Sequence, residues 1–174
     1  LTNVGGPMDS QWCDDFHDRL EDACRGGHVM PRLADALKLT HTACDDGYKA
    51  TNYPESHDEV GNENDRIAQV GRFGQGLRQN KVAAAVTLFS RGIPMWFMGA
   101  EAGEHRQFLF NRNDALDLEH YDADARSRHL RAWWKALADL RRHNPAIQGP
   151  APLAVTYAQD QLLAFSRKQT LRPE

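Results

Sequence analysis

The fold of this chain is decided by one apolar run, Ile93-Pro94-Met95-Trp96-Phe97-Met98, which ends at Gly99-Ala100-Glu101. A continuous apolar run of this length is typical of a strand that is buried on both faces. Pro94 has no N–H group to donate to a neighbouring strand, so it is expected at the beginning of the strand. We therefore predict a buried strand over residues 93–98.

Helical and strand patterns alternate on both sides of this run. Helices are expected over 14–24, after Pro31, over 82–91 and over 126–142. A short strand is expected over 48–53, and the polar stretch 55–76 is expected to be a long loop that follows it. This alternation predicts an α/β architecture with a parallel sheet, in which polar loops at the carboxyl ends of the strands hold the chemistry.

The composition changes near the C-terminus. The segment 148–152 is rich in Gly and Pro, which indicates a linker. Beyond it, 154–157 and 162–165 indicate two strands on either side of a turn. We therefore predict two units, residues 1–147 and residues 148–174, the second of which begins an all-β unit.

Composition excludes several classes of protein. The chain has 174 residues, of which 41% are hydrophobic, and this is enough to bury the core of one ordinary domain. The net charge is −3, from 21 basic and 24 acidic residues, without a long run of either sign. Neither a nucleic-acid surface nor a basic membrane patch is indicated, and no apolar run approaches the ~20 residues that span a bilayer.

The cysteines and the start of the chain indicate its setting. Cys13, Cys24 and Cys44 are odd in number and lack CxxC spacing, so we expect reduced thiols in a cytoplasmic protein. The chain starts at Leu1 without an initiator methionine or a signal-peptide pattern, and is expected to be an interior piece of a longer protein. It has no HxxxH or HExxH pair and no dinucleotide fingerprint, so neither a metal nor a cofactor is expected.

The candidate site lies in the stretch Tyr53-Pro54-Glu55-Ser56-His57-Asp58-Glu59-Val60-Gly61-Asn62. A His-Asp pair arises by chance in a chain of this composition, and His17-Asp18 is a second example. Because His17-Asp18 falls inside a predicted helix, it is expected to be part of a solvated helix surface. His57-Asp58 follows a predicted strand, where α/β proteins place their chemistry, and is the stronger candidate.

The neighbours of this pair are given plainer roles. Glu55 and Glu59 are expected to be solvated or to fix the loop, rather than to act as a general acid. Ser56, His57 and Asp58 do not form a catalytic triad, because adjacent side chains on an extended segment point to opposite faces.

Aromatic residues elsewhere are assigned to the core. The pair Trp133-Trp134 could stack on a ligand, but its helical spacing with Leu130 and Leu137 predicts core positions. Trp96 and Met98 are likewise expected to be residues of the buried strand.

Together these segments resemble the α-amylase superfamily, glycoside hydrolase family 13. In that family a strand ends in a small or polar residue followed by His-Asp, a helix intervenes, and the next strand reads Gly-(Ile/Val)-Pro, an apolar run and Gly-x-Glu. Residues 55–58 and 92–101 follow this pattern. The segment 9–17 is similar to the sixth-strand region of branching enzymes and trehalohydrolases, 133–147 to the last barrel helix, and 162–167 to the opening of the β-sandwich.

The resemblance implies that residues 1–147 are the last three βα units of a TIM (β/α)8 barrel and that residues 148–174 begin an all-β sandwich domain. It implies that Asp58 stabilises the transition state by gripping sugar hydroxyls at the cleavage point. His57 and Glu101 would be substrate-binding residues, with structural support of neighbouring loops as the alternative for Glu101. The nucleophile and the acid/base would lie upstream of the chain.

The expected substrate is an α-glucan, and the expected partner is the missing part of the same barrel. Within the family, the segment 9–12 and the Glu-Ser-His-Asp-Glu form favour a retaining 1,4-α-glucan branching-type transglycosylase. An α-amylase-type or trehalohydrolase-type glycoside hydrolase is the first alternative. A non-catalytic carbohydrate-binding relative is the second.

Overall fold

A computed structural model describes residues 8–27, 29–38, 49–62, 65–70, 75–108, 115–148 and 151–169. Its centre is a parallel sheet of three short strands in the order β1-β2-β3, as the alternating pattern predicts. The strands are β1 (Gln11–Trp12), β2 (Ala50–Asn52) and β3 (Ile93–Pro94). β2 pairs with β1 on one side and with β3 on the other, and all three of its residues are buried.

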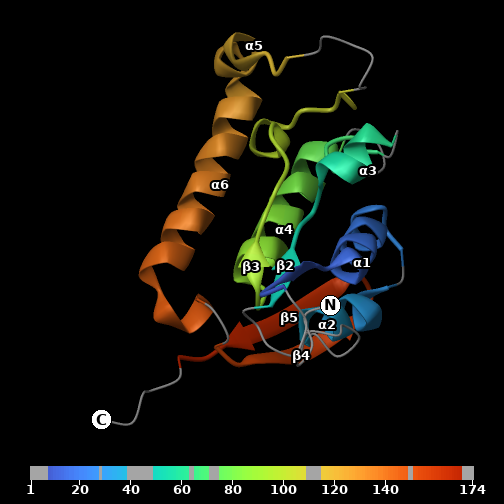
Figure 1. Cartoon of the computed structure of the whole chain (residues 1–174), viewed down its shortest axis with the longest axis vertical. Helices are drawn as coiled ribbons and strands as arrows, with labels where there is room; N and C mark the ends of the chain where they lie inside the picture. The colour runs from blue at the N-terminus through green and yellow to red at the C-terminus, as the bar shows by residue number, and fades with distance from the viewer. Residues whose placement is uncertain are drawn as a thin grey trace.

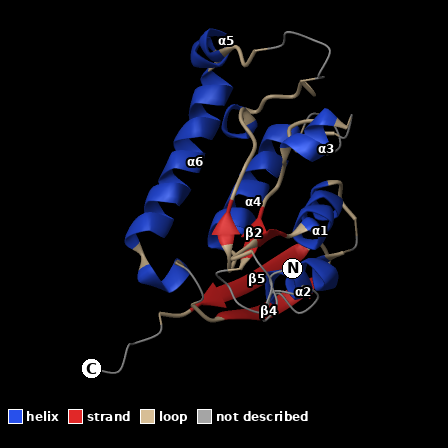
Figure 2. Ribbon diagram, viewed as in Figure 1, coloured by secondary structure: helices blue, strands red, loops and turns tan. Residues whose placement is uncertain are grey.

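Helices connect the strands (Figures 1 and 2). Between β1 and β2 the chain forms α1 (Asp14–Cys24) and α2 (Met30–Lys38), and between β2 and β3 it forms α3 (His57–Gly61) and α4 (Gly76–Phe89). After β3 come the 3-10 helix η1 (Ala100–Ala102), α5 (Leu118–Ala123), α6 (Ala125–His143) and a second 3-10 helix, η2 (Pro145–Ile147). The described chain ends in an antiparallel hairpin of β4 (Leu153–Gln159) and β5 (Leu162–Arg167).

The carboxyl ends of the three parallel strands meet at one edge of the sheet, which we call the rim. The rim segments begin at Cys13 after β1, at Tyr53 after β2 and at Met95 after β3. Figure 1 shows α3 beyond the end of β2, on this side of the sheet. In parallel α/β folds this is the edge at which side chains from several strands come together.

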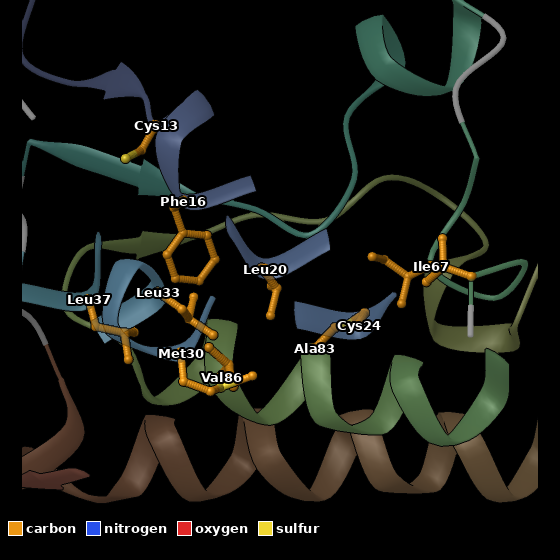
Figure 3. Close-up of a cluster of buried hydrophobic side chains, with 11 residues drawn as sticks. Cys13, Phe16, Leu20, Cys24, Met30, Leu33, Leu37, Ile67, Ala83 and Val86 are labelled. Carbon is orange, nitrogen blue, oxygen red and sulfur yellow. The ribbon is translucent and has the colours of Figure 1, made fainter. Parts of the chain in front are cut away.

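A first hydrophobic cluster fills the space between α1, α2 and α4 (Figure 3). Its side chains recur at helical spacing, so each helix turns one apolar stripe toward the others. The buried members are Cys13, Phe16, Leu20, Cys24, Met30, Leu33, Leu37, Ile67, Val70, Ala83 and Val86. The hairpin closes the cluster with four partly buried side chains, Leu153, Ala158, Leu163 and Phe165.

A second cluster joins α6 to α4 and η1. Its buried members are Ala84, Leu88, Ala100, Leu130, Trp134 and Leu137. The Trp134 indole N–H donates to Asn80 Oδ1 at 2.9 Å, and the Asn80 amide donates to the Ala100 carbonyl at 2.8 Å. These bonds satisfy the polar groups of the cluster and hold η1, which follows β3, against two helices.

The carboxyl end of α4 is capped by two arginines from distant segments. Arg141 of α6 donates to the carbonyls of Leu88, of Ser90 at 3.0 Å and of Gly92 at 2.6 Å. Arg167 of β5 donates to the carbonyls of Phe89 at 2.9 Å and Ser90 at 2.7 Å. Cationic donors at this position satisfy the carbonyls that a helix leaves unpaired and complement its dipole.

Gly92 allows the chain to enter β3 close to β2. Its φ is +99°, in the region that favours glycine, and a Cβ built on it would lie 2.5 Å from the Ala50 carbonyl oxygen. A side chain at this position would therefore force β2 and β3 apart.

Most predicted elements are present, with shifted ends. α1 has the predicted bounds of 14–24, α2 begins at Met30, and the strand expected over 48–53 covers Ala50–Asn52. α4 begins at Gly76, earlier than expected, and the predicted loop 55–76 contains the short helix α3. The hairpin follows the prediction, with Asp160 and Gln161 at positive φ in its turn. The division of the chain at residue 148 stays a prediction.

The strand expected over 93–98 is shorter and less buried than predicted. β3 covers Ile93–Pro94, and the Met95 N–H still donates to the Asn52 carbonyl at 2.9 Å. After Asn52 the chain that forms β2 leaves the sheet toward the rim. Within the described residues, the rest of the apolar run therefore has no strand beside it. Ile93, Trp96 and Met98 are 42%, 38% and 46% exposed.

The two adjacent tryptophans of α6 lie in different environments, although both were expected in the core. Trp134 is 3% exposed, whereas Trp133 is 39% exposed and contacts α4, where its indole N–H donates to the Lys81 carbonyl at 3.1 Å. Successive helical residues are turned by about 100°, so both cannot face one narrow cluster. The prediction is correct for Trp134 and wrong for Trp133.

We expect the two tryptophans to differ strongly in their contribution to stability. Trp134→Ala removes a buried ring and leaves Asn80 without its donor, and should lower the free energy of unfolding by about 3–5 kcal/mol. Trp133→Ala, the matched control, should lower it by less than about 2 kcal/mol. Urea unfolding followed by circular dichroism measures both, and equal losses would contradict this assignment of the core.

Candidate active site

His57 and Asp58 lie at the start of α3, on the rim. Their side chains are 58% and 66% exposed, and His57 Nε2 lies 3.3 Å from Asp58 Oδ1. α3 starts here because Ser56 is its N-cap: the Ser56 backbone is extended and its Oγ accepts the Glu59 N–H at 3.3 Å. The cap and the acidic first turn stabilise a helix of only five residues, which presents both groups to solvent.

Aromatic side chains of the first two strands lie next to this pair. The Trp12 ring, at the end of β1, packs edge-on against His57 with 5.5 Å between ring centroids. It also packs edge-on against Tyr53 at 5.5 Å, and Trp12 is 39% exposed. An exposed indole beside an imidazole and a carboxylate offers an apolar face together with hydrogen-bonding groups.

Tyr53 joins the ends of β1 and β2. Its hydroxyl donates to Asp14 Oδ1 at 2.6 Å. Burial raises the pKa of the Tyr53 phenol, and the bond to the Asp14 carboxylate raises it further. The phenol therefore stays protonated and acts as a hydrogen-bond donor that fixes the segment from which the site loop departs.

His17 is buried, which contradicts the prediction of a solvated helix surface. It is 4% exposed, Nδ1 lies 2.9 Å from the Pro54 carbonyl, and Nε2 lies 3.6 Å from Glu59. The reason is its position: His17 lies next to Phe16 and one turn before Leu20, on the stripe of α1 that faces inward. Asp18 is exposed, as expected.

Glu55 fixes the loop and is not solvated, which is one of the two roles expected for it. It is 2% exposed, and its carboxylate accepts from Arg66 Nη2 at 2.7 Å and from the Ile67 N–H at 2.8 Å. Burial raises the pKa of the Glu55 carboxyl, and the Arg66 guanidinium and the Ile67 N–H oppose that rise. Glu59 is partly exposed and faces His17.

Glu101 lies in η1, on the segment that follows β3. Its side chain accepts the Gly99 N–H at 3.1 Å, and Gly99 has a φ of +88°. This contact stabilises the turn between the apolar run and η1. The bond accords with loop support, one of the two roles expected for Glu101, and its substrate contact stays a prediction.

Glu104, on the same segment, is a buried carboxylate. It accepts from the backbone N–H groups of His105 and Arg106, both at 2.8 Å, and from Arg106 Nη2 at 2.7 Å. Burial acts to raise the pKa of Glu104, but the bonds from Arg106, Tyr121 and His105 outweigh it and lower the pKa to about 2. Glu104 is therefore ionised at neutral pH and shapes the rim without facing solvent.

The exposed side chains next to α3 combine hydrogen-bonding groups with an aromatic ring. Among the described residues, no group of three or more His, Cys, Asp or Glu side chains could hold a metal ion. None of the helices in the described ranges is long and apolar enough to cross a membrane. Around the start of α3 the rim exposes the Asp58 carboxylate, the His57 imidazole and the Trp12 indole, which come from the ends of two neighbouring strands.

Three of these residues were not found from the sequence. Trp12 belongs to the segment 9–17 that resembles the family, but its sequence context alone does not mark it as a site residue. Arg66 and Glu104 lie in polar stretches in which nothing distinguishes a buried charge from a solvated one. Arg66 reaches the distant Met98 carbonyl, and Glu104 accepts from Tyr121 as well as from its neighbours His105 and Arg106.

Comparisons with known proteins were made for the sequence and the structure. No family model matches the chain. The curated protein malto-oligosyltrehalose trehalohydrolase from Saccharolobus solfataricus is 29% identical, over 61% of this chain and 23% of its own length. The chain thus spans about a quarter of that relative.

Solved structures share the fold. A debranching enzyme from Nostoc punctiforme matches 92% of this chain and 35% of its own, with a TM-score of 0.67 and 17% identity. A pullulanase from Paenibacillus barengoltzii, in complex with maltotetraose, matches 90% of this chain and 28% of its own, with a TM-score of 0.65 and 17% identity. An α-amylase from Malbranchea cinnamomea matches 87% of this chain and 31% of its own, with a TM-score of 0.61 and 22% identity.

These proteins are enzymes of the α-amylase superfamily. The resemblance of this chain to that superfamily is confirmed. The relatives are glycoside hydrolases, which supports the expectation of an enzyme. The α-amylase resemblance extends over most of the described fold, whereas the identities among the structures are low enough that they establish the fold alone.

The low pKa of Glu104 predicts how the folding stability of the protein depends on pH in acid. Its folded pKa of about 2 lies below the ordinary value of 4.5, so the folded state binds fewer protons than the unfolded state between these values. The stability that Glu104 contributes is therefore fully present above pH 4.5 and is lost as the pH falls toward 2.

Glu104→Gln should be less stable than the wild type at pH 6, and the difference should narrow as the pH falls from 4.5 toward 2. Urea midpoints measured at half-unit pH steps test this. The exposed Glu119→Gln on α5 is the control and should not change the pH dependence. If the difference in urea midpoint between Glu104→Gln and the wild type stays constant with pH, the role given to the Glu104 carboxylate is refuted.

Proposed function

We propose that this chain is part of a retaining α-glucan-active enzyme, in which residues 1–147 are the last three βα units of a (β/α)8 barrel. Residues 148–174 would begin the β-sandwich that follows. The parallel strand order and the likeness to amylase-family structures support the barrel. The hairpin after residue 152 supports an all-β continuation.

The observation that carries the proposal is the exposed His57-Asp58 pair on the rim, with the Trp12 ring beside it. Hydroxyls of a sugar can donate to the Asp58 carboxylate, and a neutral imidazole can both donate and accept. As positive charge develops on the sugar ring, bonds to its 2-hydroxyl strengthen, so Asp58 would stabilise the transition state more than the bound substrate.

Bond cleavage itself needs two further carboxylates, a nucleophile and an acid/base about 5 to 5.5 Å apart. In this proposal both come from strands that precede residue 1, and the described carboxylates have other roles. Glu55 and Glu104 are buried in ion pairs with Arg66 and Arg106. Glu101 would support the rim and meet the substrate from the segment after β3.

Hydrolysis is favoured over branching. The curated relative is a trehalohydrolase, and solved relatives are described as debranching enzyme, pullulanase and α-amylase. The branching-type transglycosylase, which the segment 9–12 and the Glu-Ser-His-Asp-Glu form favour, is the second candidate. A cytoplasmic location is part of the proposal and rests on the cysteine pattern.

The products formed by the complete protein that contains this chain decide between these candidates. Release of free trehalose from maltooligosyl trehalose would establish trehalohydrolase-type hydrolysis, which is the result we expect. Many new reducing ends from amylose would indicate amylase-type hydrolysis. A falling iodine stain with few new reducing ends would indicate branching, and binding of maltohexaose without turnover would indicate the non-catalytic relative.

Asp58→Asn should lower kcat of the complete enzyme by at least ~100-fold with little change in KM, because it removes an interaction made mainly in the transition state. Asp18→Asn makes the same chemical change in the other His-Asp pair and should leave kcat and the thermal midpoint unchanged. Steady-state kinetics of both variants test this. Near-normal turnover by Asp58→Asn would refute the assignment.

A further inference from the structure

Arg66 lies between the two rim segments that carry the candidate site residues. It follows α3 in the chain, is 0% exposed, and is one of the largest fully buried side chains of the described structure. A buried guanidinium is costly unless charge and hydrogen bonds compensate it. The hydrogen-bond partners of Arg66 therefore show how its buried charge is compensated and which segments it joins.

On one side Arg66 holds the segment that follows β2. Its Nε donates to Glu55 Oε2 at 3.0 Å, and its Nη2 donates to the same oxygen at 2.7 Å. The other carboxylate oxygen of Glu55 accepts the Ile67 N–H at 2.8 Å. Residues 55 and 66–67, the two ends of the segment that carries α3, are thus tied together.

On the other side Arg66 holds the segment that follows β3. Nη2 also donates to the Met98 carbonyl at 2.8 Å, and Nη1 donates to the Arg106 carbonyl at 3.3 Å. These carbonyls lie on either side of η1, which contains Glu101. The guanidinium therefore binds the segment after β3 both before and after η1.

Two aromatic rings pack around the same guanidinium. Arg66 Cζ lies 5.4 Å from the centroid of Phe97 and 5.6 Å from that of Phe108. The rings restrict the planar group to one orientation and favour its charge. A lysine ammonium could neither bond to all of these oxygens at once nor stack in this way.

Short covalent paths lead from these contacts to the candidate site residues. Glu55 immediately precedes Ser56, the N-cap that sets the start of α3 and so the positions of His57 and Asp58. Met98 immediately precedes Gly99, whose N–H binds the side chain of Glu101. A shift of either segment relative to Arg66 would move one group of site residues relative to the other.

We propose that Arg66 is a positioning residue that locks the segment after β2 to the segment after β3, so that His57 and Asp58 keep a fixed position relative to Glu101. This inference rests on the proposed function for its consequence in catalysis. The lock itself is a property of the fold. Misplacement of a catalytic group by about 1 Å can cost ~100-fold in rate, so release of the lock should lower kcat more than it raises KM.

Hydrogen exchange of the complete protein tests the lock without any assay of activity. In Arg66→Lys, the amides of Ile67, Val60 and Glu104 should exchange at least ~10-fold faster, because the segments that hold them open more often. Arg32→Lys, on the exposed surface of α2, is the matched control and should exchange like the wild type. Wild-type exchange at both segments of Arg66→Lys would overturn the proposal.

Removal of one partner of a buried ion pair can unfold a protein, so a second variant is needed. The double variant Glu55→Met/Arg66→Met replaces both charges by apolar groups of similar length and should fold. It should show the same faster exchange at residues 56–62 and 98–104. If its segments stay as protected as those of the wild type, the ion pair does not lock them and the proposal is wrong.

Kinetics then separate positioning from mere stability. For the folded variants we expect kcat on the glucan substrate to fall ~10-fold or more, with KM changed less than ~3-fold. Faster exchange with unchanged kcat and KM would overturn the positioning role. If the wild-type protein turns over no glucan, the proposed function fails, and the exchange measurements alone still decide whether Arg66 locks the two segments.

Discussion

β2 has hydrogen-bonded neighbours on both sides, and this double pairing determines where the chain leaves the sheet toward each rim segment. The three residues of β2 are buried, and Asn52, the last of them, donates to Ser90 Oγ at 3.1 Å and to the Arg91 carbonyl at 2.6 Å. The strand thereby also holds the connection between α4 and β3. With β2 in place, the ends of β1 and β3 are brought to within reach of the segment that carries His57 and Asp58.

Charges buried behind the rim explain why its segments keep a defined shape although they are rich in polar residues. Glu55 and Arg66 compensate each other, and Glu104 is compensated by Arg106 and Tyr121. A buried charge is tolerated in a protein interior only when an opposite charge and hydrogen bonds compensate it. Because these partners must keep their positions, buried charges permit fewer loop conformations than apolar residues would. His57 and Asp58, by contrast, are exposed and lie at the start of α3.

The sequence predicts the elements better than their surroundings. Apolar spacing identifies α1, α6 and the hairpin, because these elements bury one continuous stripe or pair with an adjacent strand. The same spacing wrongly predicts that the whole run 93–98 is a buried strand, because the burial of that run depends on neighbouring strands rather than on its own residues. It also misses the inward turn of His17, because a histidine on an apolar stripe is read as polar.

The candidate site shows the same division. His57, Asp58 and Glu101 were named as candidates because a resemblance gave meaning to short motifs. All three lie on the rim, and their roles stay predictions. Arg66 and the role of Trp12 were not found, because Arg66 reaches Met98, 32 positions away, and the Trp12 ring packs against His57, 45 positions away. Glu104 was not found because its burial does not follow from the polar residues around it. Spacing along a sequence records helices and strands, but it does not record which distant carbonyl a guanidinium will reach.

The capping of α4 has a consequence for how this chain could be divided. Arg141 from α6 and Arg167 from β5 both donate to the Ser90 carbonyl, and burial together with the nearby Arg141 and Arg91 charges lowers the pKa of Arg167 to about 10. The linker near residue 148 marks a change of composition, yet the hydrogen bonds continue across it. A protein shortened at that linker would retain every residue of the sheet and of the rim, and would still lose one of the two arginines that complete the end of α4.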